Sequence, residues 1–392
     1  MKILYIVDYY QPQIGYSSYY VPKELVKLGH QVVILTCNLY FPFPNYKETA
    51  GKILGQREIA TGVKTVEGVR VIRNKVWVEF FTRAYFGGQE KIIRSFKPDI
   101  VMVDKTAGFS QIVTCLLKYK YKFKLLSVDA HLPSGFKAEG NQLAKEIFYW
   151  LFRFLFSGLI NSKVDKFIAV QEDTVEIMEK YYGINKNLVH IPLGTDTDLF
   201  HFDKEARFKL RDEYHIEHND FVIIYTGKII KEKGVHILFK AFNILVKRYK
   251  NIKMILVGSA PEDYKKICNS FLHDKYFDRV VWANFQKAKD LYKFYSMSDV
   301  AVWPLQESMS MNDAAACEIP FIANNTIGAR VRLENNNALL YKKGNSSDLA
   351  KKIEYLYKNP KIRKLMGLRG RTLMIKKLSW KAISKQYLQS VE

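Results

Sequence analysis

The chain has 392 residues, a length that predicts two or three domains rather than one hydrophobic core. Hydrophobic residues make up 48% of it and charged residues 26%, which are the proportions of a globular protein and not of a disordered or fibrous one. The formal net charge of +22 predicts a negatively charged partner, for which nucleic acid, an anionic membrane or a phosphorylated substrate would serve, unless the lysines are simply spread over the surface.

The cysteines and the first residues bear on the compartment. Cys37, Cys115, Cys268 and Cys317 form neither a CxxC pair nor a metal-ligand spacing, so we expect reduced, buried thiols in a cytosolic protein. The opening run MKILYIVDYY is too short for a secretory leader and predicts a first strand. Since no segment offers about 18 uninterrupted apolar residues, we expect no membrane-spanning helix.

Strands and helices alternate through the first half of the chain. Residues 3–7 predict a strand, 18–29 a helix that ends at a glycine, and 31–36 the next strand. Further strands are expected at 69–75, 99–104, 124–130 and 166–170. Runs that are apolar on both faces and alternate with helices indicate a parallel sheet covered on both sides.

The series restarts after residue 220. Strands are expected at 221–227, 252–258, 279–284, 300–305 and 321–325, with a helix at 234–249 after the first of them. The sequence therefore predicts an α/β protein with two doubly wound domains, at 1–192 and 193–376, and a last helix at 377–392 that packs on the N-terminal domain. Ligands of such sheets bind beyond the carboxyl ends of the strands, so two sheets facing each other would form one interdomain cleft.

Two lysines follow the strand at 221–227. Lys228 comes directly after Gly227, and Lys233 precedes Gly234 at the start of a helix. Two ammonium groups and the free N–H groups of a helix start suit a diphosphate, although solvated loop lysines would give the same pattern.

Other polar positions carry weaker signals. His131 follows a strand and could orient a hydroxyl or move a proton, but a lone histidine is more often structural. Gly15 would let the backbone approach a ligand, although it lies in no GxGxxG motif. Asp196 and Asp198 have a spacing that could hold a divalent ion, but their place at the domain join favours a turn or cap.

The segment PLQESMSMNDAAACEIPF, residues 304–321, places two acids after a strand. Glu307 and Asp313 flank a polar loop, and the small residues that follow predict a thin helix starting near Asn312. Such a helix start can come close to a phosphate or sugar, and carboxylates there can accept hydrogen bonds from vicinal hydroxyls. Asp313 could equally be a simple helix cap.

Taken in order, these segments resemble the family 4 glycosyltransferases, retaining enzymes of the GT-B fold. The resemblance covers nearly the whole chain, from the Gly15 loop to Ser379 and Trp380. It includes the segments KPDIVMVD, VHIPLGTDTDLF, YTGKIIKEKGVHILFKAF, MSDVAVWPLQES and DAAACEIPFIA.

The resemblance implies roles for the residues in the C-terminal half. Gly227, Lys228 and Lys233 would bind the donor diphosphate, and the lysines would stabilise charge on the leaving nucleotide. Asp313 stands at the second acid of the family's E-x7-E motif, which binds the donor ribose. Glu307 stands nearest the first acid, which contacts the transferred sugar.

For the N-terminal half the family implies that His131 lies by the acceptor and the donor sugar, and that Gly15 faces the donor phosphates. A UDP- or GDP-linked sugar would be the donor substrate, with no cofactor and no metal. The acceptor would attack on the same face as the departing phosphate, which would take its proton, so no conventional general base is expected.

Three departures from the family pattern affect these roles. Only five residues separate Glu307 from Asp313, so Ser308 or Ser310 could contact the sugar instead of Glu307. Glu318 stands where the family has glycine, and left-handed backbone there would cost about 1–3 kcal/mol. Tyr16 replaces the second glycine of the N-terminal loop, which could reshape the acceptor side.

Two aromatic stretches bear on the acceptor. Residues 145–160, KEIFYWLFRFLFSGLI, are too short an apolar run to span a bilayer and fit a buried or interfacial helix. Residues 118–124, KYKYKFK, alternate lysine with aromatics, as membrane-contact loops and nucleic-acid surfaces both do. With the net charge, these stretches favour peripheral binding to the inner face of an anionic membrane, and a glycan or lipid-linked acceptor; we expect no nucleic-acid partner.

Two alternatives remain open at this point. A GT-B sugar-nucleotide epimerase or sugar phosphorylase would share the fold, and the epimerase would need no acceptor. A non-catalytic basic module that binds membrane or nucleic acid would bind no donor nucleotide, and the ordered motifs argue against it.

Overall fold

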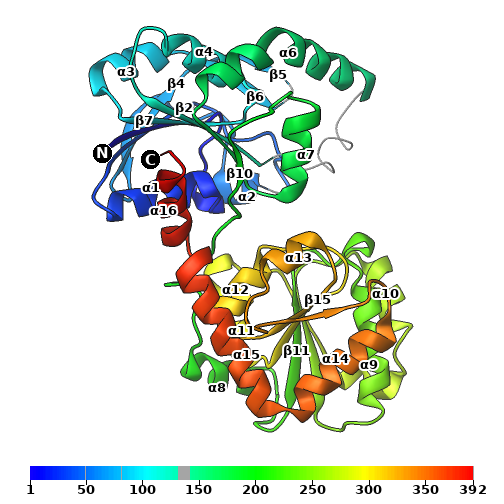
Figure 1. Cartoon of the computed structure of the whole chain (residues 1–392). Coiled ribbons are helices and arrows are strands. Elements are labelled where there is room, and N and C mark those ends of the chain that lie inside the picture. The colour runs from blue at the N-terminus through cyan, green and yellow to red at the C-terminus, as the bar shows by residue number, and fades with distance from the viewer. Residues whose placement is uncertain (49, 81, 131–141, 392) are drawn as a thin grey trace. The chain divides into compact units, whose positions relative to one another are not determined.

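The structure, a computed structural model, describes residues 1–48, 50–80, 82–130 and 142–391. The chain forms two compact units (Figure 1). Met1–Leu193 and Trp380–Glu392 form the N-terminal unit, and Gly194–Ser379 form the C-terminal unit.

The N-terminal unit contains an eight-stranded sheet of order β10-β9-β8-β7-β1-β2-β4-β3. All neighbours are parallel except β3, which pairs antiparallel with β4 at the edge. A separate hairpin joins β5 to β6. The strands are β1 (Lys2–Ile6), β2 (Gln31–Cys37), β3 (Gly62–Val66), β4 (Val69–Asn74), β5 (Val76–Phe80), β6 (Arg83–Phe86), β7 (Ile100–Asp104), β8 (Lys124–Asp129), β9 (Lys166–Ala169) and β10 (Leu188–His190).

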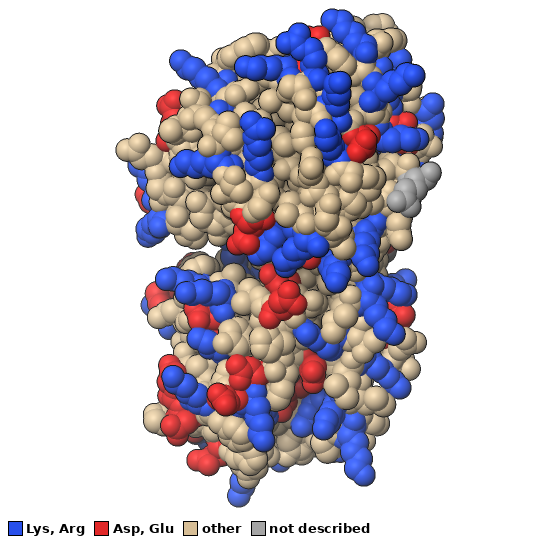
Figure 2. Space-filling view, turned by 90° about the vertical axis from the view of Figure 1, so that its left-hand side faces the viewer, with Lys and Arg blue, Asp and Glu red and all other residues tan. Residues whose placement is uncertain are grey.

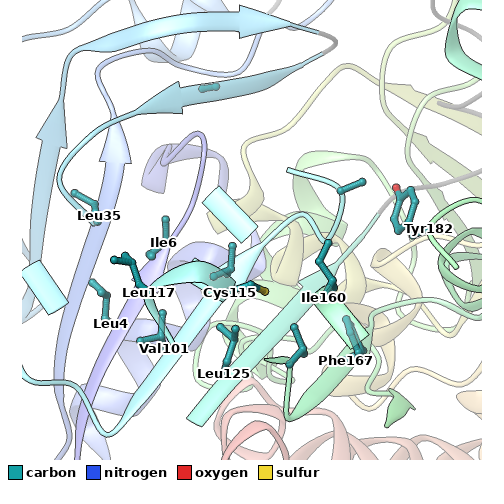
Figure 3. Close-up of a cluster of buried hydrophobic side chains, with 14 of the residues drawn as sticks. Leu4, Ile6, Leu35, Val101, Cys115, Leu117, Leu125, Ile160, Phe167 and Tyr182 are labelled. Atoms are coloured by element: carbon teal, nitrogen blue, oxygen red, sulfur yellow. The ribbon is translucent and has the colours of Figure 1, made fainter. Parts of the chain in front are cut away.

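Helices cover both faces of this sheet (Figure 1). They are α1 (Ser17–Lys27), α2 (Gly51–Leu54), α3 (Gln89–Phe96), α4 (Phe109–Leu117), α6 (Gln142–Lys163), α7 (Glu172–Lys180) and α16 (Trp380–Gln389). On the α4 and α6 side, Leu4, Val101 and Leu125 from three adjacent strands pack with Cys115 and Ile160 (Figure 3). Burying each of the larger of these side chains contributes about 1.5–3 kcal/mol, so this layer is a major part of the unit's stability.

Helix α16 covers the opposite face together with α1. The rings of Tyr20 and Trp380 are stacked, with centroids 5.0 Å apart and planes 5° apart, and the Ser384 hydroxyl donates to the Val21 carbonyl over 3.4 Å. The last helix therefore completes the unit that begins with residue 1, and it begins at Trp380 rather than at 377.

The C-terminal unit contains a six-stranded, wholly parallel sheet of order β13-β12-β11-β14-β15-β16. Its strands are β11 (Phe221–Thr226), β12 (Ile252–Val257), β13 (Val280–Ala283), β14 (Val300–Trp303), β15 (Phe321–Asn324) and β16 (Leu339–Tyr341). Its helices are α8 (Lys204–Glu213), α9 (Val235–Val246), α10 (Glu262–Asn269), α11 (Leu291–Met297), α12 (Ser310–Ala316), α13 (Ile327–Val331), α14 (Ser346–Lys358) and α15 (Pro360–Leu373).

Several details differ from the sequence-based expectations. Helix α12 begins at Ser310, two residues earlier than predicted, and the Ser308 hydroxyl accepts from the Ser310 N–H over 3.3 Å. Glu318 has φ +62°, so the left-handed backbone considered from the sequence is present. The four cysteines are free and buried, as predicted. Among the described residues, no helix combines the length and hydrophobicity needed to cross a bilayer.

Candidate functional site

The candidate site lies where the strand order of the C-terminal sheet reverses. From β11 the chain builds outward to β12 and β13, and it then returns to β14 on the other side of β11. The loops after β11 and β14 therefore lie next to each other, in the position where doubly wound sheets bind ligands. Lys228 and Lys233 lie in the first segment, and Glu307 lies in the second.

Close backbone packing shapes the loop after β11. Gly227 has φ +132°, and a Cβ on Gly258 would lie 1.9 Å from the Gly227 carbonyl oxygen, so the end of β12 requires glycine. The Tyr225 hydroxyl donates to the Lys228 carbonyl over 2.8 Å. These contacts hold the Lys228 backbone while its side chain remains exposed.

The loop after β14 is held at both of its first two residues. The Tyr341 hydroxyl donates to the Pro304 carbonyl, and the Asn324 amide donates to the Leu305 carbonyl. Gly234, at φ +72°, packs so closely against Leu305 that a Cβ would lie 2.4 Å from the Leu305 Cγ. The turn that carries Lys233 is thus packed directly on the loop that carries Glu307.

Lys233 lies between the two loops of the C-terminal unit. Its Nζ donates to the Glu307 carbonyl oxygen over 3.4 Å. Burial lowers the pKa of Lys233, the nearby Lys228 lowers it further, and Glu307 opposes both. The structure therefore brings Lys228, Lys233 and Glu307 together, and a bound anion would stabilise both ammonium groups.

The Glu307 carboxylate is directed toward the start of α13. The Thr326 hydroxyl donates to its Oε1 over 2.6 Å, and Arg332 Nη1 lies 3.5 Å from its Oε2. Arg332 also donates from Nε to the Asn312 side-chain oxygen over 2.9 Å. A Cβ on Gly328 would lie 1.8 Å from Oε2, so this carboxylate position depends on glycine there.

Asp313 has a different environment on α12. The Thr195 hydroxyl donates to its Oδ1 over 2.5 Å. Burial raises the pKa of Asp313 to about 7, while the Thr195 hydrogen bond works in the opposite direction. Burial first, and then Asp313, also raises the pKa of Tyr295, whose hydroxyl lies 2.9 Å from Thr226 Oγ1. Asp313 thus belongs to a partly buried polar cluster and does not cap α12, whose N-cap is Met309.

The remaining predicted positions are distributed as follows. Ser308 and Ser310 lie together at the start of α12, with their hydroxyls 3.2 Å apart. Gly15 belongs to the N-terminal unit and has φ +74°. A Cβ on Gly15 would lie 3.3 Å from the Tyr20 ring. His131 lies outside the described residues. Asp196 accepts from the N–H groups of Asp198 and Leu199, 3.1 Å each, which is the turn favoured from the sequence.

Four residues that adjoin Glu307 or Asp313 were not predicted from the sequence: Thr195, Thr326, Gly328 and Arg332. The only available signal was local, since Thr326 precedes a short helical pattern as an N-cap should, and its hydroxyl accepts from the Ala329 N–H over 3.3 Å. Nothing in the sequence indicates that the same hydroxyl also contacts Glu307.

Comparisons with known proteins agree with this architecture. The Glycosyltransferase Family 4 model matches residues 15–199, and the Glycosyl transferases group 1 model matches residues 206–373. The chain covers 52% to 60% of the length of the first three curated relatives that it matches. One of these is the Staphylococcus aureus capsular polysaccharide biosynthesis glycosyltransferase CapM, 30% identical over 50% of this chain and 52% of CapM.

Two further proteins match over their whole length. An uncharacterized glycosyltransferase of Methanocaldococcus jannaschii is 24% identical over 100% of this chain and 98% of its own. The Anabaena protein HepE, solved in complex with UDP and glucose, has a TM-score of 0.65 and 17% identity over 100% of this chain and 99% of its own. Two doubly wound parallel-sheet domains of this kind define the GT-B class of glycosyltransferases, so the predicted fold is confirmed. Within that class, the chain belongs to the family 4 glycosyltransferases.

Proposed function

We propose that the protein transfers a hexosyl unit from a nucleoside diphosphate sugar to a glycan or lipid-linked acceptor, with retention of anomeric configuration. The observation that supports this most directly is the grouping of Lys228, Lys233 and Glu307 where the C-terminal sheet reverses its strand order. Two cations beside a carboxylate, at the carboxyl ends of parallel strands, suit a diphosphate linked to a sugar.

The proposed roles follow from charge and position. Lys228 and Lys233 bind the diphosphate and stabilise the charge that develops on it as the sugar departs, without a metal ion. Asp313 binds the ribose, and Glu307 contacts the transferred sugar, with Ser308 and Ser310 as the alternatives beside it. Gly15 and His131 supply the contribution of the N-terminal unit to the phosphates and the sugar.

Retention is part of the proposal because no side chain is assigned as a general base. The acceptor hydroxyl attacks from the face that the diphosphate leaves, and a diphosphate oxygen takes its proton. Lys233, half-buried beside Lys228, stabilises the negative charge on the departing nucleotide.

The relatives indicate which class of acceptor and which nucleotide to test first. CapM is described as acting in capsular polysaccharide biosynthesis, which supports a glycan acceptor. HepE is solved with UDP, which makes UDP the first nucleotide to test. We further propose that the enzyme binds an anionic membrane surface, because the chain carries a net charge of +22 and because Lys and Arg predominate over Asp and Glu in the upper half of Figure 2.

The test is a thermal-shift panel of UDP, GDP and ADP and their sugars, followed by turnover assays with the donor that stabilises the protein. Acceptor-dependent release of the nucleotide, with an α-linked donor giving an α-linked product, is the expected result. Conversion of the donor without an acceptor would instead identify an epimerase. Binding of polynucleotide with no shift by any nucleotide would reduce the protein to a basic binding module.

A further inference from the structure

Helix α6 has two apolar faces. One face, with Tyr149, Phe152 and Ile160, is buried in the core. The opposite face, here called the α6 outer face, consists of side chains that are exposed: Ile147 (51%), Trp150 (65%), Leu151 (43%), Phe154 (75%) and Leu155 (59%). Their spacing of three or four residues is that of one side of a helix, so they form a continuous stripe.

An apolar stripe as exposed as the α6 outer face suggests a binding surface. Single exposed apolar residues are normal, but monomeric proteins rarely expose a contiguous apolar patch larger than a few hundred Å². On the α6 outer face, the rings of Trp150 and Phe154 stack on each other, with centroids 5.9 Å apart and planes 6° apart. These rings pack along the helix surface rather than into the core.

The β5–β6 hairpin extends the apolar surface beside α6. Trp77, Val78 and Phe80 are 63%, 53% and 48% exposed. The Phe80 ring lies edge to face against Phe148 of α6, with centroids 6.2 Å apart. The hairpin and the helix are therefore neighbouring parts of the N-terminal unit, on the side of the sheet opposite α1 and α16 (Figure 1).

A basic segment lies at the C-terminal end of α6. Lys118 donates from Nζ to the Lys163 carbonyl over 2.7 Å, and Lys163 Nζ lies 3.5 Å from the centroid of the Tyr119 ring. Tyr119 is 67% exposed, and Lys120, Lys122 and Lys124 follow it with exposed side chains. The helix that carries the apolar stripe thus contacts, at its C-terminal end, a segment of lysines with an exposed aromatic residue.

The apolar stripe and the lysines together indicate which partner binds the α6 outer face. An anionic bilayer offers hydrocarbon for the stripe and also negative headgroups for the lysines. Aromatic side chains also favour the boundary between headgroups and acyl chains. A helix of this length, about 33 Å at 1.5 Å per residue, is long enough to lie in that boundary.

We propose that the α6 outer face docks flat on an anionic lipid bilayer, with Trp77 of the hairpin beside it and Lys120, Lys122 and Lys124 on the headgroups. This inference rests on the membrane association proposed above and assigns it to one surface. It does not depend on the donor or on the transfer reaction.

The experiment is flotation of the full chain with vesicles of phosphatidylcholine alone and with about 30% phosphatidylglycerol, at moderate salt. The chain should float with the anionic vesicles. The Trp150→Ser and Phe154→Ser double variant should bind them at least about tenfold more weakly. The Lys120→Glu and Lys122→Glu double variant should lose the preference for anionic lipid.

Phe285→Ser is the matched control, since Phe285 is 67% exposed on the C-terminal unit and should float as the unaltered chain does. An unchanged melting temperature, with the same shift by the nucleotide, shows that each variant is folded. If the unaltered chain binds no vesicles, the proposed membrane association itself fails. If it floats and the Trp150/Phe154 variant floats equally, only the assignment to α6 is overturned. A dimer in sedimentation that this variant abolishes, without flotation, would instead identify a second copy as the occupant.

Discussion

Thr195 donates a hydrogen bond over 2.5 Å to the carboxylate of Asp313, which lies 118 positions further along the chain. Thr195 is also fixed through its backbone, because its N–H donates to the Leu378 carbonyl over 2.8 Å. Thr195, the second residue of the C-terminal unit, is thereby connected both to the proposed ribose-binding acid and to the last turn of the same unit.

The pKa of Asp313 makes stability depend on pH. Burial raises the pKa to about 7 from an ordinary value of 3.8, so between these pH values the folded protein holds a proton that the unfolded chain has released. The free energy of unfolding should therefore fall as pH rises from about 4 to about 7 and should then level off, and this carboxyl group should account for up to about 2 kcal/mol of the fall between pH 5 and 7.

Comparing the unaltered chain with the Asp313→Asn variant isolates this effect. Urea denaturation without nucleotide at several pH values gives the difference in unfolding free energy, which should shift in favour of the variant as pH rises. A difference that is constant between pH 4 and 8 would show that Asp313 titrates normally. Asp290→Asn is a suitable control, because side-chain hydrogen bonding from Lys293 lowers the pKa of that partly exposed acid, so its effect on stability should have the opposite pH dependence.

The Lys233→Ala variant tests the diphosphate-binding role. Removing this ammonium should lower kcat/KM for the donor by about 100-fold, because a charge aimed at the developing negative charge is lost. The stabilisation by UDP or GDP in a thermal-shift assay should decrease in parallel. Lys231→Ala is the matched control, since Lys231 is an exposed lysine of the same short turn. Equal activity in both variants would remove Lys233 from the site.

The Gly328→Ala variant tests the position of the Glu307 carboxylate. The new methyl group would overlap Oε2, which must then move away from Thr326 and Arg332. Because the obstructing atom is the end of a side chain, we expect less than about 1 kcal/mol of destabilisation but about tenfold slower sugar transfer. Gly158→Ala, where a Cβ meets nothing within 4 Å, should leave sugar transfer unchanged and, at an interior position of α6, should stabilise the protein by about 0.5–1 kcal/mol. Unaltered kinetics in the Gly328 variant would contradict a role for the carboxylate in this position.

Glu318 offers a stability test away from the charged site. It follows α12 at φ +62°, and a Cβ on Gly367 would lie 1.9 Å from its carbonyl oxygen, so α15 holds the backbone in place. Glu318→Gly should relieve strain and stabilise the protein by about 1 kcal/mol, measured by chemical denaturation. Glu318→Ala removes the carboxylate but keeps the strain, so a gain of the same size in that variant would attribute the effect to charge.

The positions of Lys228, Lys233, Glu307 and Asp313 within the fold followed from hydrophobic patterning. Strands at 221–227 and 300–305 are apolar on both faces, which identified a parallel sheet and so placed the polar residues behind its carboxyl ends. What patterning cannot supply is the partner of a side chain. Thr326 and Arg332 meet Glu307 from 19 and 25 residues away, and their contact depends on the packing of α13.

Helix α6 illustrates a second limit. A stripe of large apolar side chains has the same sequence pattern whether it faces a protein core or lies open, so residues 145–160 were compatible with both a buried and an interfacial helix. The structure shows one buried face and one exposed face: Phe152 is 4% exposed and Phe154 is 75% exposed. Burial of neighbouring positions depends on the tertiary contacts of each face, and these are not encoded in periodicity alone.

Because the last helix, α16, packs on the N-terminal unit, that unit stays incomplete until almost the whole chain has been synthesised. Helix α1 emerges early from the ribosome, yet its packing partner α16 begins only at Trp380. Until then, the surface around Tyr20 and Val21 lacks its cover, and it is open to chaperones and to aggregation during most of translation. Premature termination before residue 380 would leave both sheets complete, but on one face of the N-terminal sheet α1 would lack the helix that packs against it.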